Sequence, residues 1–546
     1  MNKKSIQRVA KAAAEEVDRA MESIQLRGHP RPYYISHLIR DEEVWRLQAK
    51  YGALHSDYHR HRRSCLADVR VGSYKYDQVQ EGGLEDSSTD DESYEYVEIP
   101  VGDQMDGVRH ALWRLTEARY REAIDGFLQR KSNEVTYLNK NRHLRAFEER
   151  PPIVDRGWSD FPEVDLEAWR EFVIKASANY KRYPLLKNGH VSFQARHTVH
   201  TFVNSEGSRL IQCRPYFSMT LYFWYLSEKG DALPYSHSIL VSDPTELPDL
   251  AATRKTIRNC YALLERLAAA PTVRSFSGPV LLDPIPAGLM IHEAVGHRLE
   301  GSRLLSTGEG QTFRDSVGQQ VLPEFLTMRD DPTVQQFDGK SLVGHYKYDD
   351  EGTPASNAQL IERGVLRGFL TSRTPIYRKH ESNGHARSRY HQRCISRMGN
   401  TIVESHDGLD DKQLRAAFIE EIKRQGVPYG VRIIEASGGE TATGSYDFQA
   451  FLGEINVASR VYPDGREELI RGVDFVGTPL NAIRNIIAAG KEYGVDNAYC
   501  GAESGFVPVT TISPSLLVSE LELQSKSETP YTQYVYPMPW EQNGKE

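Results

Sequence analysis

The sequence predicts an α+β protein, because helical and strand-forming segments are grouped along the chain rather than alternated. Residues 33–72 and 190–241 alternate apolar and polar side chains with a period of two, which is typical of antiparallel strands. Residues 105–132 and 164–181 carry apolar side chains at spacings of three and four, the pattern of helices. Repeated βαβ units would mix the two patterns. We therefore expect a mixed N-terminal α/β region followed by a β-rich C-terminal domain.

Other elements follow from the same patterns. Residues 8–26 are expected to form an amphipathic helix at the N-terminus, and residues 245–269 a second helix that leads into the short apolar strand GPVLLDP. Residues 81–95, EGGLEDSSTDDESYE, are acidic and poor in apolar side chains, so we expect an exposed, mobile loop there.

The length of the chain requires more than one hydrophobic core. A single core stops growing at about 250–300 residues, and this chain has 546. We place a boundary near residue 250, which gives an N-terminal α+β domain over residues 1–250 and a C-terminal domain over residues 251–546. The second domain is expected to be rich in strands, because short apolar runs there are separated by glycine.

Composition and charge exclude several classes of protein. The net charge of −8 argues against a nucleic-acid partner, and the basic run HRHRR at 59–63 is too short to change this. No run approaches the roughly 18 apolar residues that a membrane span requires, and no signal-peptide core occurs near the N-terminus. The 5 cysteines are scattered and odd in number, which suits a reducing compartment. We expect a cytoplasmic protein that binds neither nucleic acid nor membrane.

The segment AGLMIHEAVGHRLEG contains an HExxxH motif from His292 to His297. It is one residue longer than the zinc motif HExxH. On a regular α-helix, side chains four residues apart lie about 40° apart around the axis, whereas side chains five residues apart lie about 140° apart and cannot share one metal ion. The spacing therefore predicts that the helix is interrupted between the two histidines, and Gly296 is suited to such a break. The alternative is two surface histidines at a helix end.

A catalytic zinc site needs a third protein ligand, and the five cysteines are candidates for it. Cys500 lies in NAYCGAESG, which we interpret as a loop bounded by glycine, where a thiolate can project. Cys65, Cys213 and Cys260 lie on expected strands or helices, where a cysteine is usually a small buried apolar residue. Cys394, in HQRCISRM, remains open on this reasoning.

The chain resembles the TldD/PmbA family of metallopeptidases over most of its length. The segments that carry the resemblance occur in the family's order: HEAVGHRLEG from His292, DDEGTPASNAQLIERGVLRGFL at 349–370, SRMGNTIVE at 396–404, a Gly438-Gly439 turn and a Cys500-Gly501 loop. The resemblance implies a catalytic TldD-type member, because the related TldE/PmbA type lacks the motif. It further implies one Zn²⁺ per chain held by His292, His297 and Cys500, with Glu293 as the catalytic base.

The expected site residues lead to one expected function and to two alternative functions. We expect a zinc-dependent peptidase in which Glu293 takes the proton of a zinc-bound water. The substrate is expected to be an unstructured peptide, held as an added strand through its backbone. The partner is expected to be a second copy of the chain or a motif-less TldE/PmbA-like paralogue. The alternatives are a non-catalytic zinc-binding partner subunit and a zinc amidohydrolase of small amides.

Several charged residues could also act near the motif, but we expect each of them to be a solvated or structural charge: Arg298, Glu300, Asp349, Asp350, Glu351 and His391.

Overall fold

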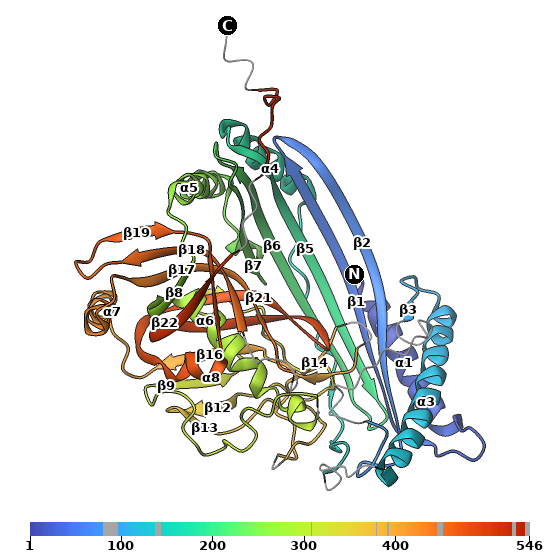
Figure 1. Ribbon diagram of the computed structural model, residues 1–546. Coiled ribbons are helices and arrows are strands. Elements are labelled where there is room, and N and C mark those ends of the chain that lie inside the picture. The colour runs from blue at the N-terminus through green and yellow to red at the C-terminus, as the bar shows by residue number, and fades with distance from the viewer. Residues whose placement is uncertain are drawn as a thin grey trace.

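Two β-sheets organise the chain and confirm the α+β class, as seen in the computed structural model (Figure 1). The structure describes residues 1–79, 97–136, 144–306, 308–377, 379–389, 392–444, 451–526 and 531–540. The acidic segment that we expect to be a loop, residues 81–95, lies outside these ranges. Among the described helices, none combines the length and the apolar character needed to cross a membrane.

The first sheet is seven-stranded and is formed by long hairpins in the N-terminal half. Its order is β3-β2-β1-β5-β6, and both β4 and β7 pair with β6. The turn between the first two strands consists of Tyr51 and Gly52, whose φ angles are 46° and 83°. Two successive residues with positive φ match the right-handed twist of the strands that they join. The strands are β1 (Pro32–Lys50), β2 (Ala53–Val71), β3 (Val97–Ile99), β4 (Val154–Asp155), β5 (Leu186–Asn204), β6 (Arg209–Leu226) and β7 (Ala232–Val241).

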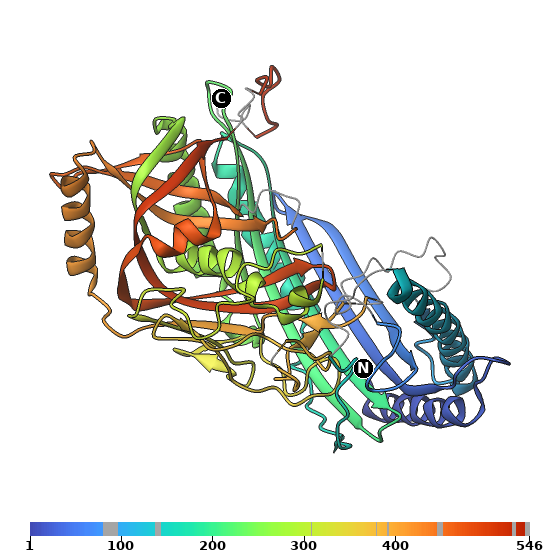
Figure 2. The ribbon, with the colours of Figure 1, turned by 60° about the horizontal axis from the view of Figure 1, so that its bottom comes forward.

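Helices pack against this sheet through apolar faces. The helix α1 (Lys3–Ser23) begins earlier than the sequence predicts, because the side chain of Asn2 accepts a hydrogen bond from the backbone of Lys4 and caps it. Such a cap contributes about 1 kcal/mol. Figures 1 and 2 show α1 and α3 (Met105–Thr136) side by side at one end of the sheet, and α4 (Leu166–Ser177) packs on β1 and β5.

The helix α5 (Leu250–Ala269) joins the two halves of the chain. The sequence pattern predicts that it begins at residue 245, but residues Pro244–Glu246 form a separate 3₁₀ turn. Pro248 disfavours helical backbone in the residue before it, and the side chain of Asp249 caps the helix by accepting a hydrogen bond from Ala252.

The second sheet is eleven-stranded and contains strands from residue 275 to residue 525. Its main path is β13-β12-β9-β16-β22-β20-β18-β17-β8, with β19 pairing β18 and β21 pairing β22. The helices α6 (Pro284–Ala294), α7 (Asp411–Gln425) and α8 (Pro479–Arg484) pack on it. The strands are β8 (Ser275–Leu282), β9 (Leu326–Asp330), β12 (Ala358–Glu362), β13 (Val365–Leu366), β16 (Asn400–Ser405), β17 (Gly430–Thr441), β18 (Phe451–Val461), β19 (Glu467–Ile470), β20 (Val473–Gly477), β21 (Ile486–Ala502) and β22 (Gly505–Ser525).

Smaller elements complete the C-terminal half. They are the strand pairs β10 (Gln336–Phe337) with β11 (Lys340–Ser341) and β14 (Ala386–Arg387) with β15 (Ile395–Ser396), and the helices α6 (Pro284–Ala294), α7 (Asp411–Gln425) and α8 (Pro479–Arg484).

Buried charges connect the first sheet to the C-terminal half. Arg40 on β1 pairs with Asp350 at 3.1 Å, and His200 on β5 contacts the other oxygen of the same carboxylate at 3.2 Å. A small apolar cluster that includes Phe202 and Cys394 lies beside them. Removing one partner from such a buried pair commonly costs about 3–5 kcal/mol, because it leaves an uncompensated charge. These contacts therefore fix how the two halves meet.

Candidate metal centre

The HExxxH motif lies where α6 ends. The α-helix runs from Pro284 to Ala294, Val295 has φ −119° and ψ −50°, and a 3₁₀ turn follows over Gly296–Leu299. The predicted interruption between His292 and His297 is thus confirmed. The helix begins favourably, because proline at the first helical position needs no hydrogen-bond partner for a backbone N–H.

Close packing, rather than an unusual backbone angle, distinguishes the position of Gly296. A Cβ atom at this position would lie 2.3 Å from Sδ of Met398, whereas φ of Gly296 is not among the positive values. The break in the helix also leaves carbonyl groups without helical donors. Arg298 replaces a missing helical donor. Its Nη1 donates hydrogen bonds to the carbonyl oxygen of Glu293 at 2.8 Å and to that of Ala294 at 3.3 Å.

Cys500 lies within β21 and not in a loop, which corrects the sequence interpretation. It pairs with Val507 across the β21–β22 hairpin, whose turn contains only Glu503 and Ser504. The glycines that suggested a loop occupy the strands instead. Gly505, with φ 87°, begins the returning strand just after the turn. Similarly, Gly438 and Gly439 lie within β17 and do not form the turn that we expected.

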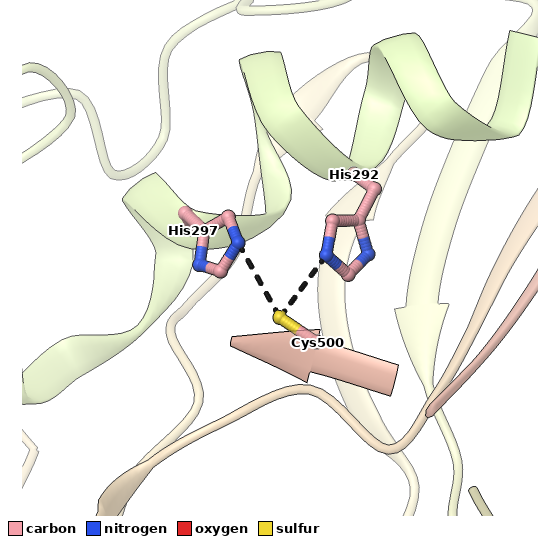
Figure 3. Close-up of side chains that lie close together, drawn as sticks. All are labelled: His292, His297 and Cys500. Carbon is pink, nitrogen blue, oxygen red and sulfur yellow. Dashed lines mark hydrogen bonds between the residues drawn. The ribbon is translucent and has the colours of Figure 1, made fainter. Parts of the chain in front are cut away.

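His292, His297 and Cys500 come together at one buried point (Figure 3). Nε2 of His292 lies 3.3 Å from Sγ of Cys500, and Nε2 of His297 lies 3.4 Å from the same sulfur. The two imidazole planes are nearly perpendicular, at 89°. The three ligand atoms all lie within 4.8 Å of one another.

This donor set has the dimensions of a zinc site. In a tetrahedral site with Zn–N of about 2.0–2.1 Å and Zn–S of about 2.3 Å, nitrogen and sulfur ligands are about 3.5 Å apart. The separations of 3.3 and 3.4 Å are close to that value. Two imidazoles and one thiolate also leave a fourth position open, as catalytic zinc sites do. The residues present therefore fit the ion.

The electrostatics of the cluster favour a thiolate. Burial alone would raise the pKa of Cys500, but the adjacent His297, His292 and Arg397 hold it well below its usual range. Burial would likewise lower the pKa of His297, yet the charges of Cys500 and Glu300 raise it to about 10. A cation bound by these groups would take the place of the protons.

Glu293 lies beside the cluster without joining it. Its Oε2 is 4.0 Å from Nε2 of His297, and burial raises the pKa of its carboxyl group. The strand β17 passes directly against this side chain, because a Cβ atom at Gly439 would lie 2.7 Å from Cγ of Glu293. The absence of a side chain at Gly439 therefore leaves room for the carboxylate.

Glu300 contacts the cluster directly, whereas the sequence predicts a solvated or structural charge. Its Oε2 lies 3.1 Å from Nδ1 of His297 and 3.0 Å from Nε of Arg303. Burial would raise the pKa of this carboxyl group, but His297 and Arg303 hold it at about 2. A sequence signal existed, since side chains three residues apart eclipse one another in a 3₁₀ turn.

Arg397 is a second residue that sequence reasoning missed. Its Nη2 lies 3.3 Å from Sγ of Cys500 and 2.8 Å from the carbonyl oxygen of that residue. About a hundred residues separate the two, so no local pattern could have revealed the contact.

The other charged candidates lie in the buried network described above or beside it. Asp350 pairs with Arg40, Glu351 accepts a hydrogen bond from the backbone of Arg373, and Asp349 accepts one from the backbone of Thr353. His391 lies outside the described residues. Cys394 is buried, and its Sγ lies 3.3 Å from Oγ of Ser388. It is not part of the three-residue cluster.

Comparison with known proteins finds one matching family model and several proteins of similar sequence. Residues 275–525 match the family model of the PmbA/TldA metallopeptidase C-terminal domain. A metalloprotease of Archaeoglobus fulgidus is 32% identical over 258 residues, which are 47% of this chain and 55% of the relative. A zinc metalloprotease TldD homolog of Saccharolobus solfataricus is 25% identical over 309 residues, or 56% of this chain and 65% of that protein. The chain thus spans less than two thirds of the length of each.

The fold is shared with a solved structure. The crystal structure of TldE from Thermococcus kodakarensis superposes with a TM-score of 0.59 at 12% identity, and the match covers 95% of this chain and 100% of that one. At this level of identity the likeness concerns the fold alone.

Proposed function

Because the chain belongs to the TldD/PmbA family of metallopeptidases, we propose that it is a zinc-dependent peptidase of the catalytic type that hydrolyses unstructured peptides. The observation that carries the proposal is the convergence of His292, His297 and Cys500 on one buried point beside Glu293. These three residues would hold one Zn²⁺ per chain.

The chemistry divides between the ion and the chain. Zinc, when bound, acidifies a water molecule and polarises a peptide carbonyl group. Glu293 takes the proton of the attacking water and passes it to the leaving amine. Its carboxylate is near the ligands, at 4.0 Å from His297, but is not one of the three converging groups, which leaves it free to carry a proton. Arg298 holds the end of the helix that carries Glu293.

The strand β17 offers an edge on which an extended peptide could be held. β8 pairs with β17 only through residues 431–433, so within the described chain residues 435–441 have β18 as their only strand partner. Gly439 brings this stretch against Glu293. A peptide that adds as a strand is recognised through backbone groups, which a folded protein has already paired. We therefore propose that unfolded polypeptides are the substrates.

Metal analysis combined with digestion of an unfolded polypeptide tests the proposal. We expect one zinc per chain in the wild type and sharply less in Cys500→Ser, His292→Ala and His297→Ala. Cys213→Ser is the matched control, because this half-buried cysteine lies on β6 in the first sheet. Full zinc and activity in Cys500→Ser would contradict the ligand assignment.

The rival functions predict other outcomes of the same experiment. Stoichiometric zinc without cleavage of any peptide would favour a non-catalytic partner subunit. Turnover of small amides but not of peptides would favour an amidohydrolase.

A separate experiment tests whether the substrate must be unfolded. One disulfide-stabilised protein is offered in its native form and in a reduced, unfolded form of identical sequence, at equal concentration. We expect rapid cleavage of the unfolded form at many kinds of residue, as mapped by mass spectrometry. Equal rates for both forms would contradict recognition through the backbone.

We also propose that the chain assembles, either with a second copy of itself or with a motif-less paralogue of the TldE/PmbA type. The shared fold with TldE supports this proposal, because two chains of one fold can pair in a pseudo-symmetric way. Light scattering of the purified protein, alone and mixed with such a paralogue, measures the assembly.

A further inference from the structure

Arg397 is fully buried and reaches the cluster from the segment before β16. Its Nη2 lies 3.3 Å from Sγ of Cys500, which is hydrogen-bond distance for a sulfur acceptor, and 2.8 Å from the carbonyl oxygen of the same residue. Its Nη1 donates to Oγ of Ser504 and to the carbonyl oxygen of Gly505. One guanidinium group thus holds both the sulfur and the turn that follows it.

Glu300 connects this arginine to the other side of the cluster. Nε of Arg397 forms an ion pair with Oε1 of Glu300 at 3.3 Å, while Oε2 of the same carboxylate contacts Nδ1 of His297. Both Glu300 and Arg397 are completely buried, so water does not screen the pair. A continuous charged chain therefore runs from Cys500 through Arg397 and Glu300 to His297.

We propose that Arg397 is a positioning residue that tunes the metal site by donating a hydrogen bond to the thiolate of Cys500. This inference rests on the proposed function, because it assumes that Cys500 is a ligand. A thiolate transfers more negative charge to a metal ion than an imidazole does, which makes the ion a weaker electrophile. A guanidinium that shares the charge of the sulfur reduces this transfer, so the ion keeps the strength needed to polarise a carbonyl group.

A purely structural role is the main alternative. The bonds to Ser504 and to the carbonyl groups of Cys500 and Gly505 would by themselves hold the β21–β22 turn. Such a role predicts a loss of stability when Arg397 is replaced but no change in the electronic properties of the sulfur. The experiment must therefore observe the metal–sulfur bond itself.

Cobalt substitution makes that bond visible, since Co²⁺ bound to a thiolate has a sulfur-to-metal charge-transfer absorption band. We expect the band of Arg397→Met to move to longer wavelength than that of the wild type, because the sulfur no longer shares its charge and gives up an electron more easily. Arg397→Lys should recover part of the shift. We expect kcat of the zinc enzyme to fall about 10–100-fold in Arg397→Met with little change in KM.

Arg373→Met is the matched control. Arg373 is as deeply buried as Arg397 and has several polar partners, including Glu206, but none of these is a member of the three-residue cluster. Its replacement should leave the charge-transfer band unshifted. An unshifted band in folded, cobalt-loaded Arg397→Met would overturn the proposal.

A measurement on the wild type covers the case in which Arg397→Met does not fold. The resonance Raman band of the cobalt–sulfur stretch is compared between protein produced in H₂O and in D₂O. We expect a shift, because deuterium replaces hydrogen in the hydrogen bond from Arg397 to the sulfur. An unchanged band would refute this hydrogen bond and with it the proposal. Failure to bind zinc or cobalt at all would instead refute the proposed metal site, so the two failures are distinguishable.

Discussion

Oε2 of Glu300 lies 3.1 Å from Nδ1 of His297, so the carboxylate fixes the nitrogen that faces away from Cys500. The contact is possible because Gly296–Leu299 is a 3₁₀ turn, which brings residues three apart onto one side. An imidazole whose Nδ1 is held in this way presents Nε2 to the sulfur and to any shared ion.

Glu300→Gln should weaken zinc binding about 10–100-fold, the usual effect of removing a partner of a ligating histidine. The affinity is measured by competition with a chromogenic chelator. Glu309→Gln is the control, because Glu309 also pairs with Arg303, at 3.0 Å, but has no contact with His297 among the described interactions. Equal losses in both variants would assign the effect to Arg303 and not to His297.

Glu293→Gln should keep the fold and the zinc but lose activity on the order of 10²–10⁴-fold, the range expected for a positioned general base. The amide has nearly the same shape as the carboxylate but cannot accept the proton. Zinc content and peptide turnover are measured on the same preparation. Loss of zinc would indicate that Glu293 is a ligand.

Gly439→Ala should reduce kcat without removing zinc. The new Cβ would lie 2.7 Å from Cγ and 3.0 Å from Oε1 of Glu293, so the carboxylate must move. Gly438→Ala is a close control, because this adjacent glycine lies in the same strand and a Cβ atom there would have no neighbouring atom within 4 Å. Steady-state kinetics should separate the two variants, and equal activities would show that Glu293 tolerates displacement.

The contribution of His37 to stability should fall as the pH decreases from about 6.5 towards 4. His37 is fully buried, with Nε2 2.9 Å from Oγ1 of Thr116, and burial lowers its pKa to about 4. An unfolded histidine has a pKa of about 6.5 and takes up a proton first, so acid favours the unfolded state. The contribution is complete above pH 6.5, and about 2 kcal/mol of it is lost at pH 5.

Thermal unfolding at pH 7.5 and pH 5.0 measures this effect. His37→Gln should show a smaller difference between the two midpoints than the wild type does. His55→Gln, at an exposed position on β2, should leave the difference unchanged. An identical pH response in His37→Gln and in the wild type would exclude His37 as a source of the pH-dependent loss of stability.

Local patterns predicted much of the fold. The period of two in residues 33–72 corresponds to β1 and β2, and the angular argument about His292 and His297 correctly required a broken helix. Errors arose where glycine was interpreted as a loop signal. Gly501, Gly438 and Gly439 lie within strands. The missing side chain makes room for Phe506 at Gly501 and for Glu293 at Gly439, whereas a Cβ atom at Gly438 would have no neighbouring atom within 4 Å.

The candidate site was predictable only in part. His292, Glu293 and His297 form one local motif. Cys500 was predicted from the family resemblance and from an expected loop context, and the structure places it in the strand β21 instead. Arg397 is buried by tertiary contacts that no spacing in the sequence encodes. The contact between Glu300 and His297 could have been predicted if the segment after the helix break had been treated as a 3₁₀ turn, which has three residues per turn.

The close approach of Gly296 and Met398 should couple two distant positions of the chain in evolution. Any side chain at position 296 would compete with the sulfur of Met398 for the same volume, because its Cβ would lie only 2.3 Å from that atom. Related chains that carry alanine at the position of Gly296 should therefore carry a residue smaller than methionine at the position of Met398. The two sites should change together across the family, although about a hundred residues of sequence separate them.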